Sequence, residues 1–141
     1  MKKLLLFLLC TVVTLSGCSS FNEETAKKSV EQEINSFYDN LLMEDIDAVM
    51  KQVSTDSEQY YNLYDNYRDI FQKYNYSYQL KEISYDQVSK DIVVASVSLT
   101  VSGVNRDQEY DTYDAVQTFT FKSVSDNKWK ITAIDDKYDF K

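Results

Sequence analysis

The hydrophobic pattern of this chain changes its period once, and this change limits the fold more than any other feature. Before Tyr76, apolar residues recur every three or four positions, which is the spacing of one face of a helix. From Tyr76 onward, apolar and polar residues alternate, which is the spacing of a half-buried strand. Helices followed by strands indicate an α+β domain, in which the helices pack on one face of a curved antiparallel sheet.

The first part of the chain predicts three helices. A first helix is expected over about 23–43, because its apolar residues share one face. A second, shorter helix follows Asp45, whose side chain suits the N-cap position. The segment Thr55-Asp56-Ser57-Glu58 has the T-x-x-E pattern of a capping box. It predicts a third helix that begins there and ends near Tyr74.

The third predicted helix carries an aromatic stripe, and the stripe has two interpretations. Its members recur at helical spacing and are Tyr60, Leu63, Tyr64, Tyr67, Ile70, Phe71 and Tyr74. A row of exposed rings would form a platform for a ligand. The same row would also form the packing face of an amphipathic helix that lies on a sheet, and we favour this second interpretation.

Four strands are predicted after the third helix. The first begins at Tyr76, and its inward parity changes between Leu80 and Ile83, which indicates a β-bulge. The second covers 92–101, where aliphatic residues alternate with serine and threonine. Both strands therefore have one face suited to a core and one face suited to solvent.

A polar loop is expected over 102–111, followed by a third strand over 113–122 that has Gln117 among its inward residues. Turn residues at 125–127 lead to the last strand. One face of this last strand is formed by Trp129, Ile131 and Ala133. Short connections between successive strands imply an antiparallel meander.

The N-terminus has the layout of a secretory signal, with two lysines, an apolar run over 4–13 and small residues before Cys18. The run is shorter than the roughly 20 apolar residues that a membrane-spanning helix needs. The motif Leu15-Ser16-Gly17-Cys18 resembles the lipobox of bacterial lipoproteins. This resemblance implies cleavage between Gly17 and Cys18, and a diacylglyceryl group with acyl chains such as palmitate on the Cys18 sulfur.

The lipobox resemblance divides the chain into three parts. Residues 1–17 form the signal peptide, 18–24 the lipidated N-terminus and tether, and 25–141 a single α+β domain. Two acyl chains anchor a protein stably, whereas one chain binds only marginally. We therefore expect the domain at the extracytoplasmic face of the bacterial cell membrane, or at the outer membrane in a cell that has one.

Several kinds of chemistry are excluded by what the chain lacks. It contains no histidine, and its two cysteines are Cys10, which leaves with the signal, and Cys18, which carries the lipid. Ser-His-Asp or Cys-His catalysis, zinc sites with histidine or cysteine ligands, and disulfides are therefore not expected. No cofactor is predicted, because Gly103 alone cannot form a glycine-rich phosphate loop. A net charge of −8 opposes binding to nucleic acid.

Two segments resemble the nuclear transport factor 2-like superfamily: INSFYDNLLMEDIDAVMKQV at 34–53 and NKWKITAID at 127–135. The resemblance implies a cone, in which the curved four-stranded sheet wraps the helices and leaves a pocket at its open end. A cystatin-like meander is the alternative fold. In enzymatic members of the superfamily, such as ketosteroid isomerases and polyketide cyclases, acidic, histidine or tyrosine residues line the pocket.

One dense group of acidic and tyrosine residues lies next to a predicted strand: Tyr110, Asp111, Tyr113 and Asp114. A buried aspartate can act as a base and a tyrosine can donate to an enolate, so this group is the candidate pocket. The alternative is an exposed loop that leads into a strand. The group lacks the D-x-D-x-D-G spacing of an EF-hand loop, and no metal site is predicted.

Two functions remain open. The first is a non-catalytic binding or interaction module, whose partner is another protein, a cell-wall component or a small apolar ligand. The missing histidine favours this function. The second is an isomerase or cyclase that uses aspartate and tyrosine, and Asp111 or Asp114 buried in an apolar pocket beside a tyrosine hydroxyl would favour it. Self-association through the open sheet face, usual in the superfamily, would give a homodimer.

Overall fold

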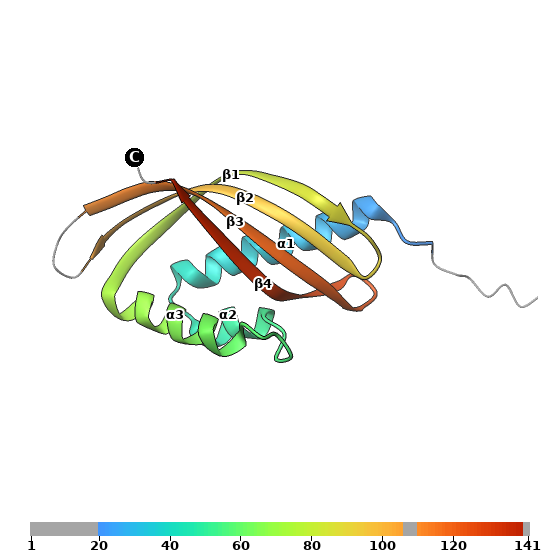
Figure 1. Ribbon diagram of the computed structural model, residues 1–141, viewed down its shortest axis with the longest axis horizontal. Coiled ribbons are helices and arrows are strands. Elements are labelled where there is room, and N and C mark those ends of the chain that lie inside the picture. Colours follow the sequence, from blue (N-terminus) through green and yellow to red (C-terminus); the bar gives the residue numbers. More distant parts are fainter. Residues whose placement is uncertain (1–19, 106–109, 140–141) are drawn as a thin grey trace, which may run out of the picture.

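In the computed structural model the described residues, 20–105 and 110–139, form three helices followed by four strands (Figure 1). The helices are α1 (Glu23–Leu42), α2 (Ile46–Gln52) and α3 (Tyr60–Lys73). The strands are β1 (Tyr74–Val88), β2 (Ile92–Asn105), β3 (Tyr110–Ser125) and β4 (Lys128–Asp139). The order of the elements confirms the α+β prediction.

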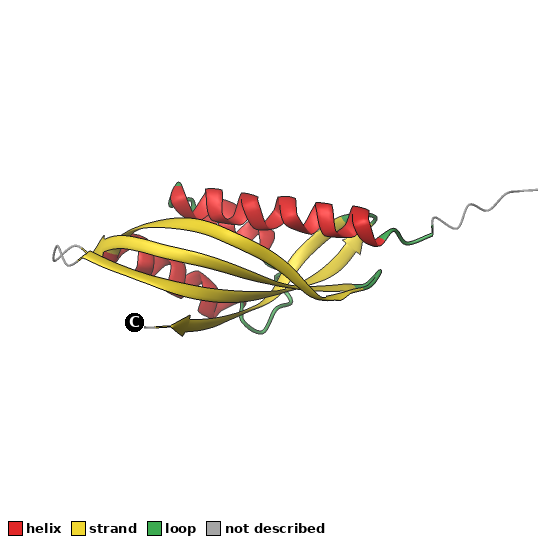
Figure 2. Ribbon diagram, turned by 90° about the horizontal axis from the view of Figure 1, so that it is seen from above, coloured by secondary structure: helices red, strands yellow, loops and turns green. Residues whose placement is uncertain are grey.

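The strands form one antiparallel sheet in the order β1-β2-β3-β4, so each strand pairs with the next one in the chain. The helices pack on one face of this sheet, and the long α1 lies along the strongly twisted strands (Figure 2). The predicted meander and the predicted packing of helices on a curved sheet are therefore confirmed.

The helix α1 supplies one side of the core, because its apolar residues share one face. Its buried residues are Ala26, Val30, Ile34, Phe37, Tyr38 and Leu41. Phe37 meets Phe119 of β3 edge to face, with 5.3 Å between the ring centres. Burying a side chain of this size contributes about 1.5–3 kcal/mol. In the described part of the chain the buried core runs from Ala26 to Ile134, so residues from 20 onward hold a core of their own.

The aromatic stripe of α3 packs against this core. Leu63 and Tyr67 are buried, and the other stripe residues of the helix are half-buried against the same cluster. The interpretation of the stripe as a packing face is thus confirmed. Asp45 is also confirmed as the N-cap of α2, since its Oδ1 accepts from the Ala48 N–H at 2.9 Å.

The start of α3 differs from the prediction. The helix begins at Tyr60, so the capping box predicted at Thr55 is wrong. The preceding residues bond to β4 instead, where the Ser57 hydroxyl donates to a main-chain carbonyl at 2.6 Å. The Gln59 side-chain oxygen accepts from the Ile134 N–H at 2.9 Å. These contacts with a distant strand hold the segment in a turn until α3 begins.

The β2–β3 hairpin is longer than predicted. β2 continues to Asn105 and β3 begins at Tyr110, so the prediction of a loop over 102–111 is wrong in its extent. The middle of that segment, 106–109, lies outside the described residues. Serine and threonine on the outer face make the strand ends as polar as a loop, which is why composition alone misplaced them.

A bulge changes the inward face of β4. Thr132 is an extra residue between two neighbouring pairs of the β3–β4 ladder. After it, Ile134 is buried and Ala133 is only half-buried, so the prediction that Ala133 shares a face with Trp129 and Ile131 is wrong. A second bulge lies in β1 between Leu80 and Glu82, which confirms the one predicted there.

Candidate functional site

The predicted acidic and tyrosine group lies entirely on β3, and its members are Tyr110, Asp111, Tyr113 and Asp114. Tyr113 pairs with the buried Val101 and packs against the core, so it lies on the helix-facing side of the sheet. Asp114 pairs with Thr100 and lies on the outer face, because successive strand residues alternate. The structure therefore separates Tyr113 from Asp114. The side chains of Tyr110 and Asp111 lie outside the described part, and a pocket of all four residues stays a prediction.

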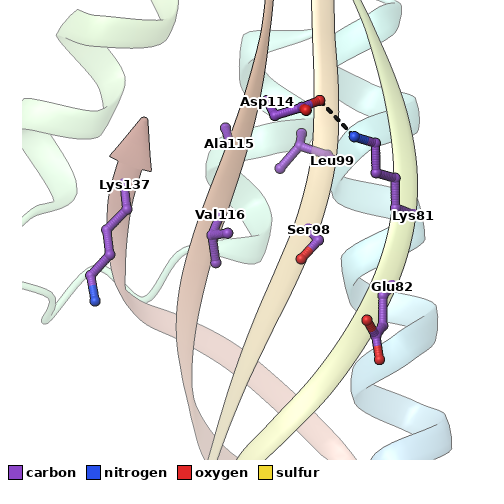
Figure 3. Close-up of a pocket in the computed structure, with 8 residues that line it drawn as sticks. All are labelled: Lys81, Glu82, Ser98, Leu99, Asp114, Ala115, Val116 and Lys137. Carbon is purple, nitrogen blue, oxygen red and sulfur yellow. Dashed lines mark hydrogen bonds and ion pairs between the residues drawn. The ribbon is translucent and has the colours of Figure 1, made fainter. Parts of the chain in front are cut away.

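Asp114 lines a hollow of about 460 Å³ on the outer face (Figure 3). Its carboxylate accepts from Lys81 Nζ at 2.6 Å and from the Thr100 hydroxyl at 2.8 Å. The β1 bulge places Lys81 and Glu82 together beside the hollow, and Lys137 of β4 lies on the opposite side. Partly exposed ion pairs of this kind contribute about 0–1 kcal/mol. Asp114 is thus part of a charged surface and does not lie in an apolar pocket.

A different polar network lies on the helix-facing side, between α1 and the strands. The Tyr38 hydroxyl of α1 donates to the side-chain oxygen of Gln117. The Gln117 side-chain nitrogen donates to Asp136 Oδ1 at 2.7 Å. Gln117 on β3 and Asp136 on β4 are direct partners in the sheet, so the ladder itself aligns them. Tyr38 is buried, whereas Asp136 is exposed, and the network runs from the core to the surface.

Tyr38 and the neighbouring Tyr78 remain protonated far above neutral pH. Burial raises the pKa of Tyr38 above its usual value of 10.0, and the nearby Asp136 carboxylate and Tyr78 raise it further. Burial likewise raises the pKa of Tyr78, with smaller contributions from Tyr113, Tyr76 and the carboxylates of Asp136 and Glu44. The Tyr38 and Tyr78 rings are 5.6 Å apart. Both phenols therefore stay protonated at physiological pH and are poor general bases.

Sequence reasoning found the members of this network only in part. Tyr38 lies within the predicted first helix, 23–43, and the sequence places Gln117 among the inward residues of the third predicted strand. A polar residue at an inward position is the signal that the sequence offers. Asp136 was missed, because the alternation that starts at Trp129 places it outward. The bulge at Thr132 reverses that parity and brings Asp136 opposite Gln117.

Residues 20–105 and 110–139 contain no group of three or more histidine, cysteine, aspartate or glutamate side chains placed to hold a metal ion. No helix in the same ranges is both long enough and apolar enough to cross a membrane.

The curved meander packed on helices is the nuclear transport factor 2-like fold, and this fold defines the class of the domain. The family within this class is narrower. The chain belongs to the family of the C-terminal domain of the anti-sigma-I factor RsgI9, whose model matches residues 24–138. A search of curated proteins finds no match to the chain.

Solved structures with the same fold come from several bacteria. A nuclear transport factor 2-like protein from Salmonella enterica superposes with a TM-score of 0.74 at 14% identity, over 85% of this chain and 95% of that one. A ketosteroid isomerase-like protein from Erwinia carotovora gives 0.66 at 18% identity, over 84% and 98%. A protein with a cystatin-like fold from Nostoc punctiforme gives 0.61 at 14% identity, over 80% and 90%. At such low identity these likenesses show the fold alone.

Proposed function

We propose that this chain is a lipid-anchored, non-catalytic binding or interaction module at the extracytoplasmic face of a bacterial membrane. The name of its family supports a role in binding, because it describes part of an anti-sigma factor and not an enzyme. The observation that carries the non-catalytic part of the proposal is the position of Gln117 between Tyr38 and Asp136. Its amide already engages the Tyr38 hydroxyl and Asp136 Oδ1 in hydrogen bonds within the domain, so this pair is not arranged as an acid and a base for a substrate.

The anchor is tested by exchanging single cysteines. Cys18→Ala removes the sulfur that would carry the lipid, and we expect a precursor that stays unlipidated and uncleaved. Cys10→Ala makes the same chemical change inside the signal segment and should leave a mature, detergent-phase lipoprotein. The measurement is metabolic labelling with a fatty acid, followed by detergent phase partitioning. A Cys18→Ala protein that is still labelled and cleaved would refute the anchor.

The binding function is tested by native mass spectrometry of residues 20–141. A reproducible excess mass that disappears on denaturation would identify a small apolar ligand. A clean mass without ligand would direct the search to protein or cell-wall partners, through crosslinking on intact cells. A compound that binds and is then released in chemically altered form would favour the alternative function, an isomerase or cyclase that uses aspartate and tyrosine.

A second copy of the chain is a further candidate partner. The outer-face hollow carries Lys81 and Lys137 together with Glu82 and Asp114, so it presents both signs of charge to a copy related by a two-fold axis. Val116 lies at the hollow and is 37% exposed. Sedimentation velocity should show a dimer that Val116→Glu converts to monomers. A monomer at all concentrations would exclude this partner.

A further inference from the structure

A groove lies outside the sheet–helix core, between α2, the segment that leads into α3, the start of α3 and the β3–β4 hairpin. Its volume is about 600 Å³, within the range of about 300–1,000 Å³ that is usual for small-molecule sites. The two short helices that border it lie next to each other in Figure 1. No residue of the tyrosine network or of the outer-face hollow lines this α2–α3 groove.

One wall of the α2–α3 groove is apolar. Met50 and Val53 line it and belong to the buried core. Tyr60 and Tyr64 are one turn apart on α3, and both are half-buried, so they pack on the core and also line the groove. Val124 adds an apolar side chain from β3 that is 58% exposed. This wall suits a ligand that has an apolar face.

The polar side chains around the groove are not used within the domain. Across 20–105 and 110–139, the side chains of Asp47, Lys51 and Asp56 form no hydrogen bond or ion pair. The hydroxyls of Tyr60 and Tyr64 also have no hydrogen-bond partner in these ranges. Carboxylates accept hydrogen bonds, ammonium groups donate them, and hydroxyls do both. A ligand rich in hydroxyl groups could therefore bond to every one of these side chains.

The charges of the groove are balanced. Asp47 and Asp56 provide two carboxylates, and Lys51 and Lys130 provide two ammonium groups. The Lys130 ammonium already donates to the Lys51 carbonyl at the end of α2. A polyanion would be repelled by the carboxylates and a polycation by the ammonium groups, so neither is favoured. The groove fits an uncharged ligand that combines an apolar face with many hydroxyl groups.

An extended peptide matches this groove less well. Peptides that add to a sheet bind mainly through main-chain hydrogen bonds with a free strand edge. The edge of β4 beside the groove is already occupied, because Val53 bridges to Ile131 and the Ser54 N–H donates to the Ile131 carbonyl. The groove therefore presents side chains in place of a free strand edge.

We propose that the α2–α3 groove binds an uncharged saccharide chain. The C–H faces of the sugar rings pack on Tyr60 and Tyr64. The sugar hydroxyls donate to the carboxylates of Asp47 and Asp56 and accept from Lys51. The proposal gives a ligand class to the binding function proposed above and rests on that function, but it does not depend on the lipid anchor.

Binding is tested by isothermal titration calorimetry of residues 20–141. The probes are three uncharged hexasaccharides, namely cellohexaose, chitohexaose and maltohexaose. Hexagalacturonate and the hexamer of chitosan are charged probes of the same length, one anionic and one cationic. We expect at least one uncharged hexasaccharide to bind, and both charged probes to bind at least threefold more weakly than it does. Binding by none of the three, or a difference of less than threefold, would overturn the proposal.

Two pairs of variants locate the site of the hexasaccharide that binds. Tyr60→Leu should weaken its binding at least fivefold, whereas Tyr61→Leu should leave it unchanged, because Tyr61 is 79% exposed and does not line the groove. Asp56→Ala changes an exposed side chain without altering the core and should weaken binding at least threefold. Asp135→Ala, equally exposed on β4 but outside the groove, is its control. Saccharide binding that neither Tyr60→Leu nor Asp56→Ala weakens would refute the groove as the site and leave the binding function in place.

Discussion

Tyr38 is a polar side chain that α1 carries into the core, where it is 2% exposed. A hydroxyl in such a place needs a partner, and Gln117 provides it from β3. Gln117 in turn donates to Asp136, so its amide is held at both its oxygen and its nitrogen. The three side chains therefore fix the position of α1 against two strands more specifically than apolar packing alone would do.

Removing one oxygen tests this network. Tyr38→Phe keeps the ring and its packing but leaves the Gln117 oxygen without this donor. We expect the free energy of unfolding to fall by about 1–2 kcal/mol. Tyr61→Phe is the matched control, because Tyr61 is 79% exposed and should change stability by less than about 0.5 kcal/mol. Urea denaturation of both variants provides the comparison, and equal effects would contradict a structural role for the hydroxyl.

The raised pKa values of Tyr38 and Tyr78 also predict how stability depends on pH. In the unfolded chain both side chains ionise near their usual pKa of 10.0, whereas in the folded chain both pKa values are higher. Their stabilising contribution is therefore complete below pH 10.0 and decreases as the pH rises above it. Urea midpoints between about pH 8 and 11 should fall steeply for the parent chain and less steeply for Tyr38→Phe. Parallel curves would contradict the prediction.

Gly103 of β2 lies where no side chain fits. A Cβ at this position would lie 2.2 Å from Tyr76 Cδ1 and 2.6 Å from the Asn75 carbonyl oxygen. The ring could rotate, but the main-chain oxygen is held in the sheet. Gly103→Ala should therefore destabilise the domain by about 1–3 kcal/mol in thermal or urea unfolding. Ser102→Ala, one residue away on the outer face, is the control, and a similar loss there would disprove the steric explanation.

At the scale of elements, the segment before α3 covers the edge of β4. Val53 forms a parallel bridge to Ile131, and the Ser54 N–H donates to the Ile131 carbonyl at 2.7 Å. Ser57 and Gln59 continue this contact along the strand. A covered edge cannot pair with another chain, which is how natural sheets limit aggregation. The segment thus completes the sheet instead of extending the helix.

The structure and the capping-box pattern make opposite predictions for two neighbouring residues. Gln59→Ala leaves the Ile134 N–H of β4 without its acceptor and should cost about 1–3 kcal/mol. Glu58→Ala should cost less than about 0.5 kcal/mol, because Glu58 is exposed and α3 begins at Tyr60. If Glu58→Ala proved the more damaging in urea denaturation, the segment would be a helix cap after all.

The sequence predicted best those elements whose structure depends on residues that are close together in the chain. The change of period at Tyr76 predicted the class of fold, and Asp45 predicted the start of α2. The failures at the start of α3 and in the site involve partners that are far apart in the chain. Ser57 lies within the capping-box pattern, but Ser57 and Gln59 both bond to residues of β4 that are 75 positions later in the chain. The site was hardest to predict, since pairing Gln117 with Asp136 needs both the register of β3 with β4 and the bulge at Thr132.

At the scale of the whole molecule, the proposed lipid anchor would place the two ends of the domain at different distances from the membrane. The chain entry, the β1–β2 turn and the β3–β4 turn lie at one end (Figure 1). The end of β4 and the junction of α3 with β1 lie toward the other end. If Cys18 carries the lipid, the short connection to Ser20 keeps the first end close to the bilayer and leaves the second end exposed to partners.

Single labels can test this orientation, because the proposed mature protein has no other free thiol: Cys10 leaves with the signal and the Cys18 sulfur carries the lipid. Lys128→Cys places a fluorescent donor near the membrane end, and Lys73→Cys places one near the opposite end. Both residues are exposed, so neither substitution disturbs the core. In vesicles with an acceptor on the head groups, energy transfer should be stronger from residue 128 than from residue 73. Equal transfer would mean that the domain tumbles on its tether, and the reverse order would mean that its other end faces the bilayer.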